Sequence, residues 1–338
     1  MGGRALIVVL WGGPALAQVV QPPQPPIRVQ VNEVQVPITV TDDKGRFVTD
    51  LEAKDFRIYD EGKLQTITYF SREGNQPVVV GFLLDMSNAM RIHWKHFQDA
   101  TMELVFGLLP GDRKFHGYLV TYSTDAEVAV NTTWDSEKIV EKLRKIKPGG
   151  GAALYDAIYK ACTTRSLIPG EPYQPRRVLV IIGDGHDNSS KKSLEEVLEI
   201  AQRNLVTIYA MSTVAFGFNS EGEKNLIRLC EKTGGRVEYP LNRLYKDVSG
   251  YLSTPSDEGN YAYKVGTGGY AAELSQGIFN AVKAIAGEVT TQYILRYVPS
   301  AGPEGQLNNK VFRTIRVEVA NLPNVKIRAR EGYYLMTP

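Results

Sequence analysis

The sequence predicts an α/β protein in which a doubly wound, mostly parallel sheet is inserted into a discontinuous antiparallel β-sandwich. Residues 78–84 and 178–182 are unbroken apolar runs. Such runs are typical of parallel strands that are buried on both faces, and helical patterns separate them along the chain. The sandwich is predicted by a different pattern. Strand-like alternation of apolar and polar residues occurs at the two ends, in residues 27–75 and 290–338.

Composition is that of an ordinary globular protein. The chain has 338 residues, of which 43% are hydrophobic and 22% charged, so it is long enough for two domains with real cores. Its 39 basic and 37 acidic residues give a formal net charge of +2. This balance gives no electrostatic basis for binding nucleic acid, so we predict no nucleic-acid partner. Composition does not indicate an oligomeric state.

The first 17 residues have the pattern of a signal peptide. Arg4 precedes an apolar run too short to span a bilayer, and residues 15–17 form a small-residue cleavage site. Residues 18–26 are proline-rich and predict an extended linker. We therefore expect an exported mature protein that begins near Gln18, has no transmembrane span and is periplasmic, extracellular or at the cell surface. A frayed apolar N-terminus is the alternative.

Residues 76–289 alternate between strand and helix patterns. We expect strands near residues 78–84, 117–122, 126–131, 177–183 and 205–211, and helices near residues 94–108, 136–146, 154–162, 193–203, 221–233 and 274–285. This alternation predicts βαβ units, and hence a mostly parallel sheet with helices on both faces. Residues 240–270 are rich in tyrosine, glycine, serine and proline without periodicity, which predicts an irregular insertion.

The two terminal segments are expected to fold together. Turn signals at residues 42–45 and 60–62 divide the first segment into short strands, and three alternating runs divide the second. Neither segment is long enough to bury a core alone. We therefore predict one sandwich made of residues 27–75 and 290–338, with residues 76–289 inserted as a separate domain.

Cys162 and Cys230 are the only cysteines, and both lie in helical patterns. Export permits a disulfide without requiring one. We favour two unpaired thiols that pack as small hydrophobic side chains, and a bridge between them stays open.

Polar side chains follow the two apolar strands where each ends. Asp85 and Ser87 follow the first strand, and Asp184 follows the second. Ligands of open α/β sheets bind beyond the carboxyl ends of the strands, so these residues are expected to meet. Carboxylate and hydroxyl oxygens are ligands that suit Mg²⁺. The sequence thus predicts a metal site formed by these three residues.

Three motifs resemble the von Willebrand factor type A family. They are Asp-x-Ser at 85–87, Gly-Gly-x-Ala-Leu-Tyr-Asp-Ala at 150–157 and Asp-Gly-x-Asp-Asn at 184–188. The terminal segments, including Arg-Glu-Gly-Tyr-Tyr at 330–334, resemble the exported VWFA-related Acidobacterial domain subfamily. The resemblance implies a non-enzymatic protein-binding or adhesion module with a metal-ion-dependent adhesion site. In this family, that site is built from Asp-x-Ser-x-Ser, a threonine and a third-loop aspartate.

The chain departs from that pattern at two positions. Ala89 stands where the family has its second serine, and Ala152 stands where it has threonine. Asn88 and Asp187 are the candidate substitutes. Each lost oxygen contact is worth about 1–3 kcal/mol, although water can fill coordination positions of Mg²⁺. The resemblance therefore implies Mg²⁺, or Mn²⁺ or Ca²⁺, bound weakly or not at all, with an acidic side chain of a protein partner at the open position.

Two other functions stay open. A metal-independent scaffold or assembly factor would use other surfaces, such as the tyrosines of the 240–270 stretch. These tyrosines are Tyr245, Tyr251, Tyr261, Tyr263 and Tyr270. Residues 183–188 also resemble the late motif of Mg²⁺-dependent haloacid-dehalogenase-type phosphatases. Those enzymes need a second aspartate two residues after the nucleophilic one, where this chain has Ser87, so we predict no enzymatic activity.

Overall fold

The structure is a computed structural model. It describes residues 33–72, 77–91, 93–167, 175–214, 220–242, 258–300, 311–320 and 322–334. The predicted signal peptide and the linker that follows it lie outside these ranges. Residues 32–338 form one compact unit, which contains every element described below.

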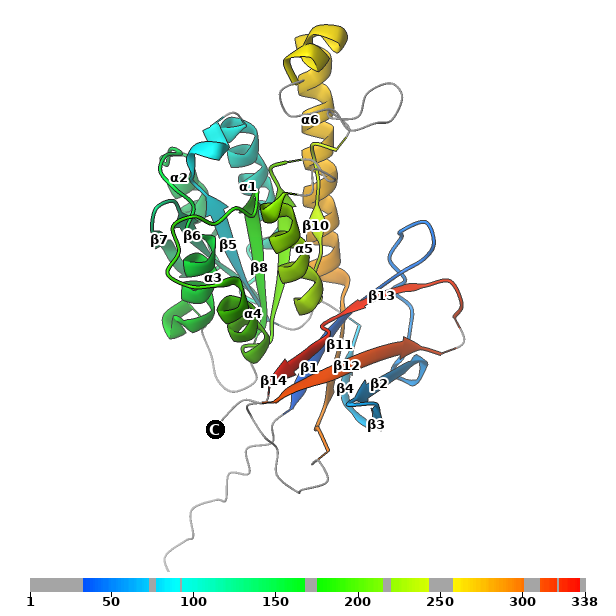
Figure 1. Ribbon diagram of the computed structural model, residues 1–338. Helices are drawn as coiled ribbons and strands as arrows, with labels where there is room; N and C mark the ends of the chain where they lie inside the picture. The colour runs from blue at the N-terminus through cyan, green and yellow to red at the C-terminus, as the bar shows by residue number, and fades with distance from the viewer. Residues whose placement is uncertain are drawn as a thin grey trace, which may run out of the picture. The chain divides into compact units, whose positions relative to one another are not determined.

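A six-stranded sheet lies at the centre of the inserted domain, in the order β10-β9-β8-β5-β6-β7 (Figure 1). Its strands are β5 (Val78–Asp85), β6 (Phe115–Tyr122), β7 (Ala126–Thr133), β8 (Arg176–Gly183), β9 (Val206–Ser212) and β10 (Val237–Glu238). Neighbouring strands are parallel, with the exception of the antiparallel pair β6 and β7. The prediction of a mostly parallel sheet is confirmed.

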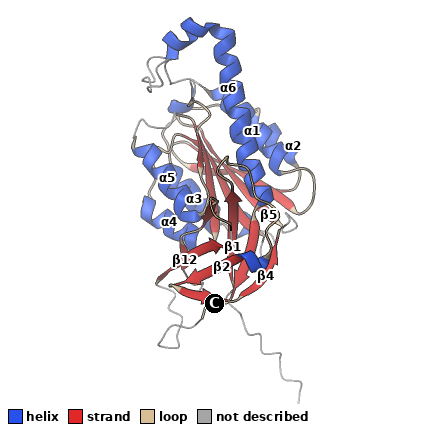
Figure 2. Cartoon of the chain, turned by 90° about the vertical axis from the view of Figure 1, so that its right-hand side faces the viewer, coloured by secondary structure: helices blue, strands red, loops and turns tan. Residues whose placement is uncertain are grey.

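Helices cover both faces of this sheet. They are α1 (Trp94–Leu108), α2 (Ser136–Leu143), α3 (Leu154–Thr163), α4 (Leu194–Arg203), α5 (Glu221–Thr233) and α6 (Glu258–Thr291). Buried residues of α1, α2 and α6 share one hydrophobic core with the sheet, and those of α3, α4 and α5 share another. Figure 2 shows the two groups of helices on opposite sides of the strands.

Strand β5 is buried along its whole length because its side chains enter both cores. The even-numbered positions from Val78 to Leu84 belong to the core under α1, α2 and α6. Val79 and Leu83 point the other way and belong to the second core. This two-sided burial is the physical reason why the run lacks polar residues. Cys162 and Cys230 lie buried in the second core as free thiols, as predicted.

The sandwich consists of two four-stranded antiparallel sheets, in the orders β13-β1-β11-β4 and β14-β12-β2-β3. Its strands are β1 (Val34–Thr41), β2 (Phe56–Asp60), β3 (Lys63–Gln65), β4 (Ile67–Ser71), β11 (Tyr293–Tyr297), β12 (Phe312–Val319), β13 (Lys326–Ala329) and β14 (Gly332–Tyr334). Each sheet combines strands from both ends of the chain, and together they enclose a third core. The predicted discontinuous architecture is confirmed.

Three short 3₁₀ helices complete the described structure: Ala53–Asp55, Asn88–Arg91 and Arg165–Leu167. The ends of two helices are fixed by their capping residues. Asp135 accepts a hydrogen bond from the Glu137 backbone N–H at 3.1 Å and caps α2, as its sequence position predicts. Gly234, in a left-handed conformation with φ of 88°, ends α5.

One part of the predicted irregular insertion is wrong. Helix α6 begins at Glu258, so residues 258–270 are helical. The apolar residues Leu274, Ile278 and Ile285 fix the helix in the core that it shares with α1. Once a helix is nucleated, each added residue gains a hydrogen bond, so the helix extends into a segment whose composition shows no period. Residues 243–257, with Tyr245 and Tyr251, lie outside the described ranges.

A buried polar network joins α6 to the sandwich and the central sheet. The carboxylate of Glu288 is fully buried and lies 2.7 Å from Arg328 Nη2 and 3.0 Å from Arg236 Nε. It also accepts hydrogen bonds from the Thr39 hydroxyl at 3.1 Å and the Tyr209 hydroxyl at 3.3 Å. Because Glu288 lies near the end of α6 and its partners lie on β1, β9 and β13 and just before β10, this carboxylate ties the two domains together.

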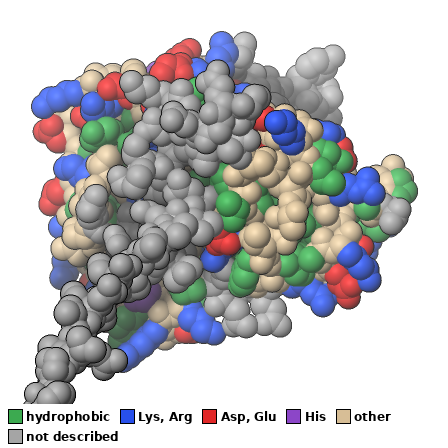
Figure 3. All heavy atoms as spheres, turned by 90° about the horizontal axis from the view of Figure 1, so that it is seen from below, with side chains coloured by type: hydrophobic (Ala, Val, Ile, Leu, Met, Phe, Trp, Pro, Cys, Tyr) green, Lys and Arg blue, Asp and Glu red, His purple; other side chains and the backbone are tan. Residues whose placement is uncertain are grey.

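Charged side chains of both signs are interspersed with hydrophobic ones on the face seen from below (Figure 3), in keeping with the small net charge. No helix within the described ranges combines the length and the apolar character that crossing a bilayer requires.

Candidate metal centre

The loops that follow β5 and β8 meet at one edge of the central sheet. The two strands are parallel neighbours and pair up to Leu84 and Ile182, so Asp85 and Asp184 emerge side by side. The loop before α3 joins them. The Gly149 backbone N–H donates to the carbonyl of Met86 at 2.6 Å, and the Asn88 N–H donates to that of Gly150 at 3.1 Å. The three predicted motifs therefore converge in space.

Asp85 is fully buried at the base of this edge. Its Oδ1 accepts a hydrogen bond from the Ser87 backbone N–H at 2.6 Å, which fixes the turn after β5. Its Oδ2 has no hydrogen-bond partner among the described residues. Burial raises the pKa of Asp85 to about 7, with the Ser87 hydrogen bond opposing the shift and the Asp184 charge adding to it. A buried carboxylate with an open oxygen favours an approaching cation.

Ser87 and Asp184 line an open depression of about 370 Å³ above Asp85. Ser87 lines it although the residue is only 5% exposed. Asp184 Oδ1 accepts a hydrogen bond from the His186 backbone N–H at 2.9 Å, and its Oδ2 lies 3.8 Å from His186 Nδ1. Asn88, Ala89 and Ala152 belong to the same wall, whereas Asp85 does not reach it.

Two glycines hold Asp184 in place. A Cβ atom on Gly183 would lie 2.4 Å from the Tyr122 hydroxyl and 2.9 Å from Asp85 Cβ. Gly185 has φ of 80°, and a Cβ there would lie 2.2 Å from the carbonyl oxygen of Gly222, at the start of α5. The Gly-Asp-Gly sequence is therefore required by close packing on both sides of the aspartate.

The two candidate substitutes occupy different places. Asn88 is exposed and lines the depression. Asp187 accepts hydrogen bonds from the Tyr155 backbone N–H at 2.8 Å and the Ser190 hydroxyl at 2.6 Å through Oδ2. Its Oδ1 accepts from the Ser190 backbone N–H at 3.1 Å. Asp187 thus holds the first turn of α3 against the loop after β8, and it is absent from the wall of the depression.

Sequence reasoning missed two residues of this site. Tyr122 pairs with Asp85 across the β6–β5 ladder, and its buried hydroxyl has no hydrogen-bond partner among the described residues. Burial raises the pKa of Tyr122 well above its usual value, and the charge of Asp85 adds to the shift. His186 is part of the depression wall. The position of Tyr122 at the end of the strand beside β5 was the signal that could have identified it.

The donor set suits a hard cation that keeps several bound waters better than one that is held entirely by protein ligands. Two carboxylates and a hydroxyl are the ligands that Mg²⁺ takes while it keeps several waters. Within the described ranges no group of three or more histidine, cysteine, aspartate or glutamate side chains is arranged to hold a metal. The open Oδ2 of Asp85, beneath Ser87 and Asp184, is the structural feature that such a cation would neutralise.

A family model for the von Willebrand factor type A domain matches residues 80–243. The chain contains a von Willebrand factor type A (VWA) domain. The match spans β5 to β10 of the central sheet, and it includes every residue of the site. The fold predicted by the resemblance is thus confirmed for the inserted domain.

Several solved structures are similar to the chain at low identity. BatB from Bacteroides thetaiotaomicron is 17% identical, with a TM-score of 0.39, 59% of this chain and 99% of that chain covered. A von Willebrand factor type A protein from Catenulispora acidiphila is 10% identical, with a TM-score of 0.43 and coverage of 91% and 75%. Proximal thread matrix protein 1 from the mussel byssus, with a zinc-occupied MIDAS motif, is 15% identical, with a TM-score of 0.43 and coverage of 68% and 49%. The comparison with curated proteins gives no match.

Proposed function

We propose that this chain is a non-enzymatic protein-binding module whose VWA domain recognises a partner at the depression beside Ser87 and Asp184. VWA domains are in general interaction modules, which supports this class of function. The observation that carries the proposal is an open depression lined by the Asp184 carboxylate and Ser87, next to the buried Asp85, whose Oδ2 has no hydrogen-bond partner among the described residues. Such a site offers a partner a charged contact of defined position.

In this proposal the site has a reduced metal-binding set. The Ser87 hydroxyl and the Asp184 carboxylate offer oxygens at the wall, and Asp85 supports them by accepting the Ser87 N–H. Mg²⁺, or Mn²⁺ or Ca²⁺ in its place, supplies a positive charge when it is bound there. An acidic side chain of a protein partner then finds both a cation and an open coordination position.

A metal-independent contact is the second candidate, and a specific observation favours it. Ala89 and Ala152 place methyl groups on the wall where the family pattern has oxygen donors. The depression itself persists without those donors. A partner would then bind through shape and through polar groups such as Asn88, Asn188 and His186. In that case, removing divalent cations leaves partner binding intact.

Phosphatase chemistry has no support at this site. A nucleophilic aspartate must reach its substrate, but Asp85 is fully buried and does not line the depression. Ser87 occupies the position of the second acid. We therefore retain a binding function. Export of the protein belongs to the same proposal, and it is supported by the N-terminal sequence alone.

Calorimetric titration of the full chain with Mg²⁺ and Mn²⁺ tests the proposal. Native protein is expected to bind weakly, and Asp184→Ala is expected to abolish binding, while Asp43→Ala, at an exposed turn of the sandwich, has no effect. The restored variant Ala89→Ser/Ala152→Thr should bind about tenfold tighter or more, because it regains two oxygen contacts. Ala271→Ser/Ala272→Thr, at two exposed positions of α6, is the matched control.

The possible outcomes separate the two candidates. Native binding that Asp184→Ala removes supports the metal-dependent module. If only the restored variant binds, the metal-dependent proposal fails and the metal-independent contact takes its place. If neither protein binds, the depression is not a metal site in any form, and the assignment of Asp85 and Asp184 as ligands is wrong.

A further inference from the structure

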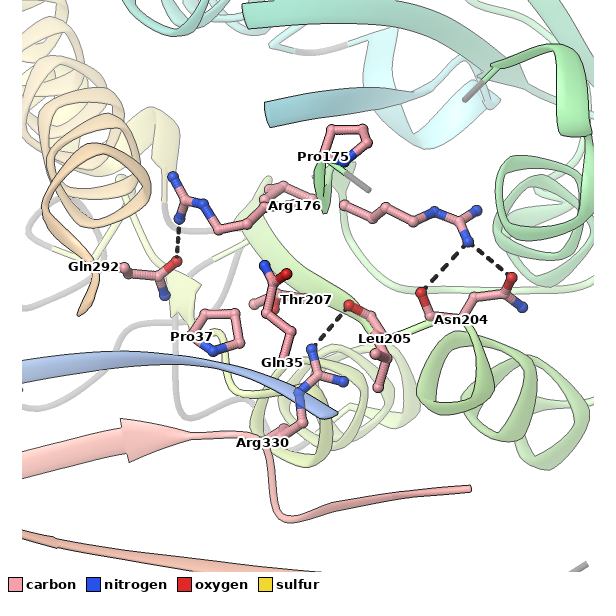
Figure 4. Close-up of a pocket in the computed structure, with 11 residues that line it drawn as sticks. Gln35, Pro37, Pro175, Arg176, Asn204, Leu205, Thr207, Gln292 and Arg330 are labelled. Atoms are coloured by element: carbon pink, nitrogen blue, oxygen red, sulfur yellow. Dashed lines mark hydrogen bonds between the residues drawn. The ribbon is translucent and has the colours of Figure 1, made fainter. Parts of the chain in front are cut away.

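A second cavity lies at the opposite edge of the central sheet. It is formed where β8 and β9 begin, against β1 of the sandwich and the connection between β13 and β14 (Figure 4). Its volume is about 40 Å³, which is room for about three water-sized spheres. Figure 4 shows Gln35 and Thr207 between the side chains of Arg176 and Arg330. Arginines from both domains thus line one small cavity.

Arg176, the first residue of β8, is only 3% exposed. Its Nη1 donates to the Gln292 side-chain carbonyl at 2.8 Å, and its Nη2 donates to the backbone carbonyl of Val289 at 2.7 Å. Its Nε is buried without a hydrogen-bond partner in the described part of the chain. The acceptors of this cation are therefore neutral.

Arg330, between β13 and β14, is 2% exposed. Its Nη2 donates to the backbone carbonyl of Leu205 at 2.8 Å, whereas Nε and Nη1 have no hydrogen-bond partner among the described residues. Leu205 adopts a left-handed conformation with φ of 52°, which is unusual for a leucine. Two of the three guanidinium nitrogens of Arg330 are thus left open.

Neither guanidinium is balanced by a carboxylate. In the described ranges, no acidic group forms an ion pair with Arg176 or Arg330, and no carboxylate charge contributes to the pKa of either. The buried carboxylate of Glu288 is engaged by Arg236 and Arg328 instead. Burial lowers the pKa of both Arg176 and Arg330 to about 10, so both stay charged at neutral pH.

A third arginine adds to this excess of positive charge. Arg177 lines the same cavity, and its Nη1 and Nη2 donate to the Asn204 side chain at 2.8 Å and to the Cys162 carbonyl at 3.0 Å. Burying an unpaired charge carries a large desolvation penalty. Open guanidinium N–H groups are donors that bind small anions in proteins.

We propose that this cavity binds one small inorganic anion, which neutralises Arg176 and Arg330. Its size excludes nucleotides and peptide segments but accommodates a halide or a single oxyanion. Gln35 and Thr207 line the same space and supply further polar contacts. Because Arg176 belongs to the VWA domain, whereas Gln35 and Arg330 belong to the sandwich, a bound anion fastens the two domains to each other. This site does not depend on the proposed metal centre.

Thermal unfolding of the full chain at constant ionic strength is the first measurement. Sodium gluconate, whose anion is too large for the cavity, is exchanged stepwise for chloride, sulfate or phosphate. At 100 times the dissociation constant, the anion that binds should raise the Tm by about 5 °C. Calorimetric titration with that anion should then give one site per chain.

Two variants and a control connect the effect to the cavity. Arg330→Met removes a buried charge, so it should fold, lose the anion-dependent rise in Tm and weaken binding at least about tenfold. Gln35→Leu, at a half-buried position of the same wall, should weaken binding without altering the buried charge, and it serves where Arg330→Met fails to fold. Arg57→Gln removes an exposed arginine of β2 and should leave the response unchanged.

Two results overturn the proposal. In one, none of the three anions raises the Tm or gives heat with native protein, which means that the cavity holds water only. In the other, Arg330→Met and Gln35→Leu keep the full anion response, which means that the anions act elsewhere on the surface.

Discussion

The two edges of the central sheet carry opposite charges that are left unpaired for different reasons. At the carboxyl edge, Asp85 is buried beneath an open depression, and its Oδ2 has no partner among the described residues. At the amino edge, Arg176 and Arg330 line a small cavity, and both have guanidinium N–H groups without a partner among the described residues. An unpaired charge next to a depression that is open to solvent is suited to pairing with a cation or partner that binds reversibly. An unpaired charge that is buried between two domains is suited to an ion that stays bound.

The difference in how the two edges are built also explains what each contributes to stability. Loops that follow β5 and β8, with the loop before α3, form the depression at the carboxyl edge, and its lining residues all belong to the inserted domain. The amino edge is formed by residues from five separate parts of the chain, near Gln35, Arg176, Leu205, Gln292 and Arg330. Substitutions at the amino edge should therefore lower the stability of both domains, whereas substitutions at the carboxyl edge should affect the stability of the VWA domain alone.

The largest effect is expected for Glu288→Gln, next to the amino edge. It removes the buried counter-charge of Arg328 and one of the two carboxylates that pair with Arg236, the other being Glu238, and breaking a buried ion pair in this way costs about 4 kcal/mol. Urea unfolding should show a loss of this size. The partly exposed glutamate of the Arg316–Glu318 pair provides the control, because Glu318→Gln should change the free energy of unfolding by no more than about 0.5 kcal/mol. An equal loss in both variants would show that the Glu288 network does not join the domains.

A smaller effect of opposite sign is expected for Asp85→Asn at the carboxyl edge, in the presence of a chelator. The folded-state pKa of Asp85 is raised to about 7 from 3.8, so the folded protein binds the proton more tightly than the unfolded chain. Native stability therefore falls as the pH rises from about 4 to about 7, and this loss is complete above pH 7. Asp85→Asn removes the buried charge and should raise the free energy of unfolding at pH 8 by about 2 kcal/mol.

The pH profile supplies the control for that variant. At pH 4 the native carboxyl is already mostly protonated, so Asp85→Asn and native protein should have nearly equal stability there. Saturating Mg²⁺ should narrow the gap at pH 8 if the metal centre is occupied, because the cation then balances the carboxylate. A variant that is less stable than native protein at pH 8 would mean that the Asp85 charge is compensated within the protein.

The carboxyl edge could be predicted from sequence, and the amino edge could not. Asp85, Ser87 and Asp184 each follow a recognisable apolar strand, and parallel strands bring their ends together. The Asp-x-Ser and Asp-Gly-x-Asp-Asn patterns therefore pointed to this candidate site. Arg176 and Arg330 lie far apart in sequence, and no local pattern shows that they share a cavity. Their unpaired state depends on tertiary contacts across the domain junction.

The secondary-structure elements likewise divide into those that the sequence predicts and those that it does not. Apolar strands, capped helices and the discontinuous sandwich follow from period and composition, and the structure confirms them. The beginning of α6 does not, since residues 258–270 have no apolar period and are helical as a continuation of a packed segment. The unpaired hydroxyl of Tyr122 was likewise missed, because its role depends on which strand lies beside β5.

The smallest expected effect distinguishes a cap from a metal ligand at the carboxyl edge. Asp187 accepts hydrogen bonds from the Tyr155 backbone N–H and from Ser190, so Asp187→Ala should cost about 1 kcal/mol through loss of a helix-terminal contact. Its metal affinity should equal that of native protein. Asp135→Ala, which removes the cap of α2, is the matched control with a similar loss of stability. A drop in Mn²⁺ affinity for Asp187→Ala but not for Asp135→Ala would instead place Asp187 among the ligands, which would mean that the loop after β8 rearranges when a cation binds.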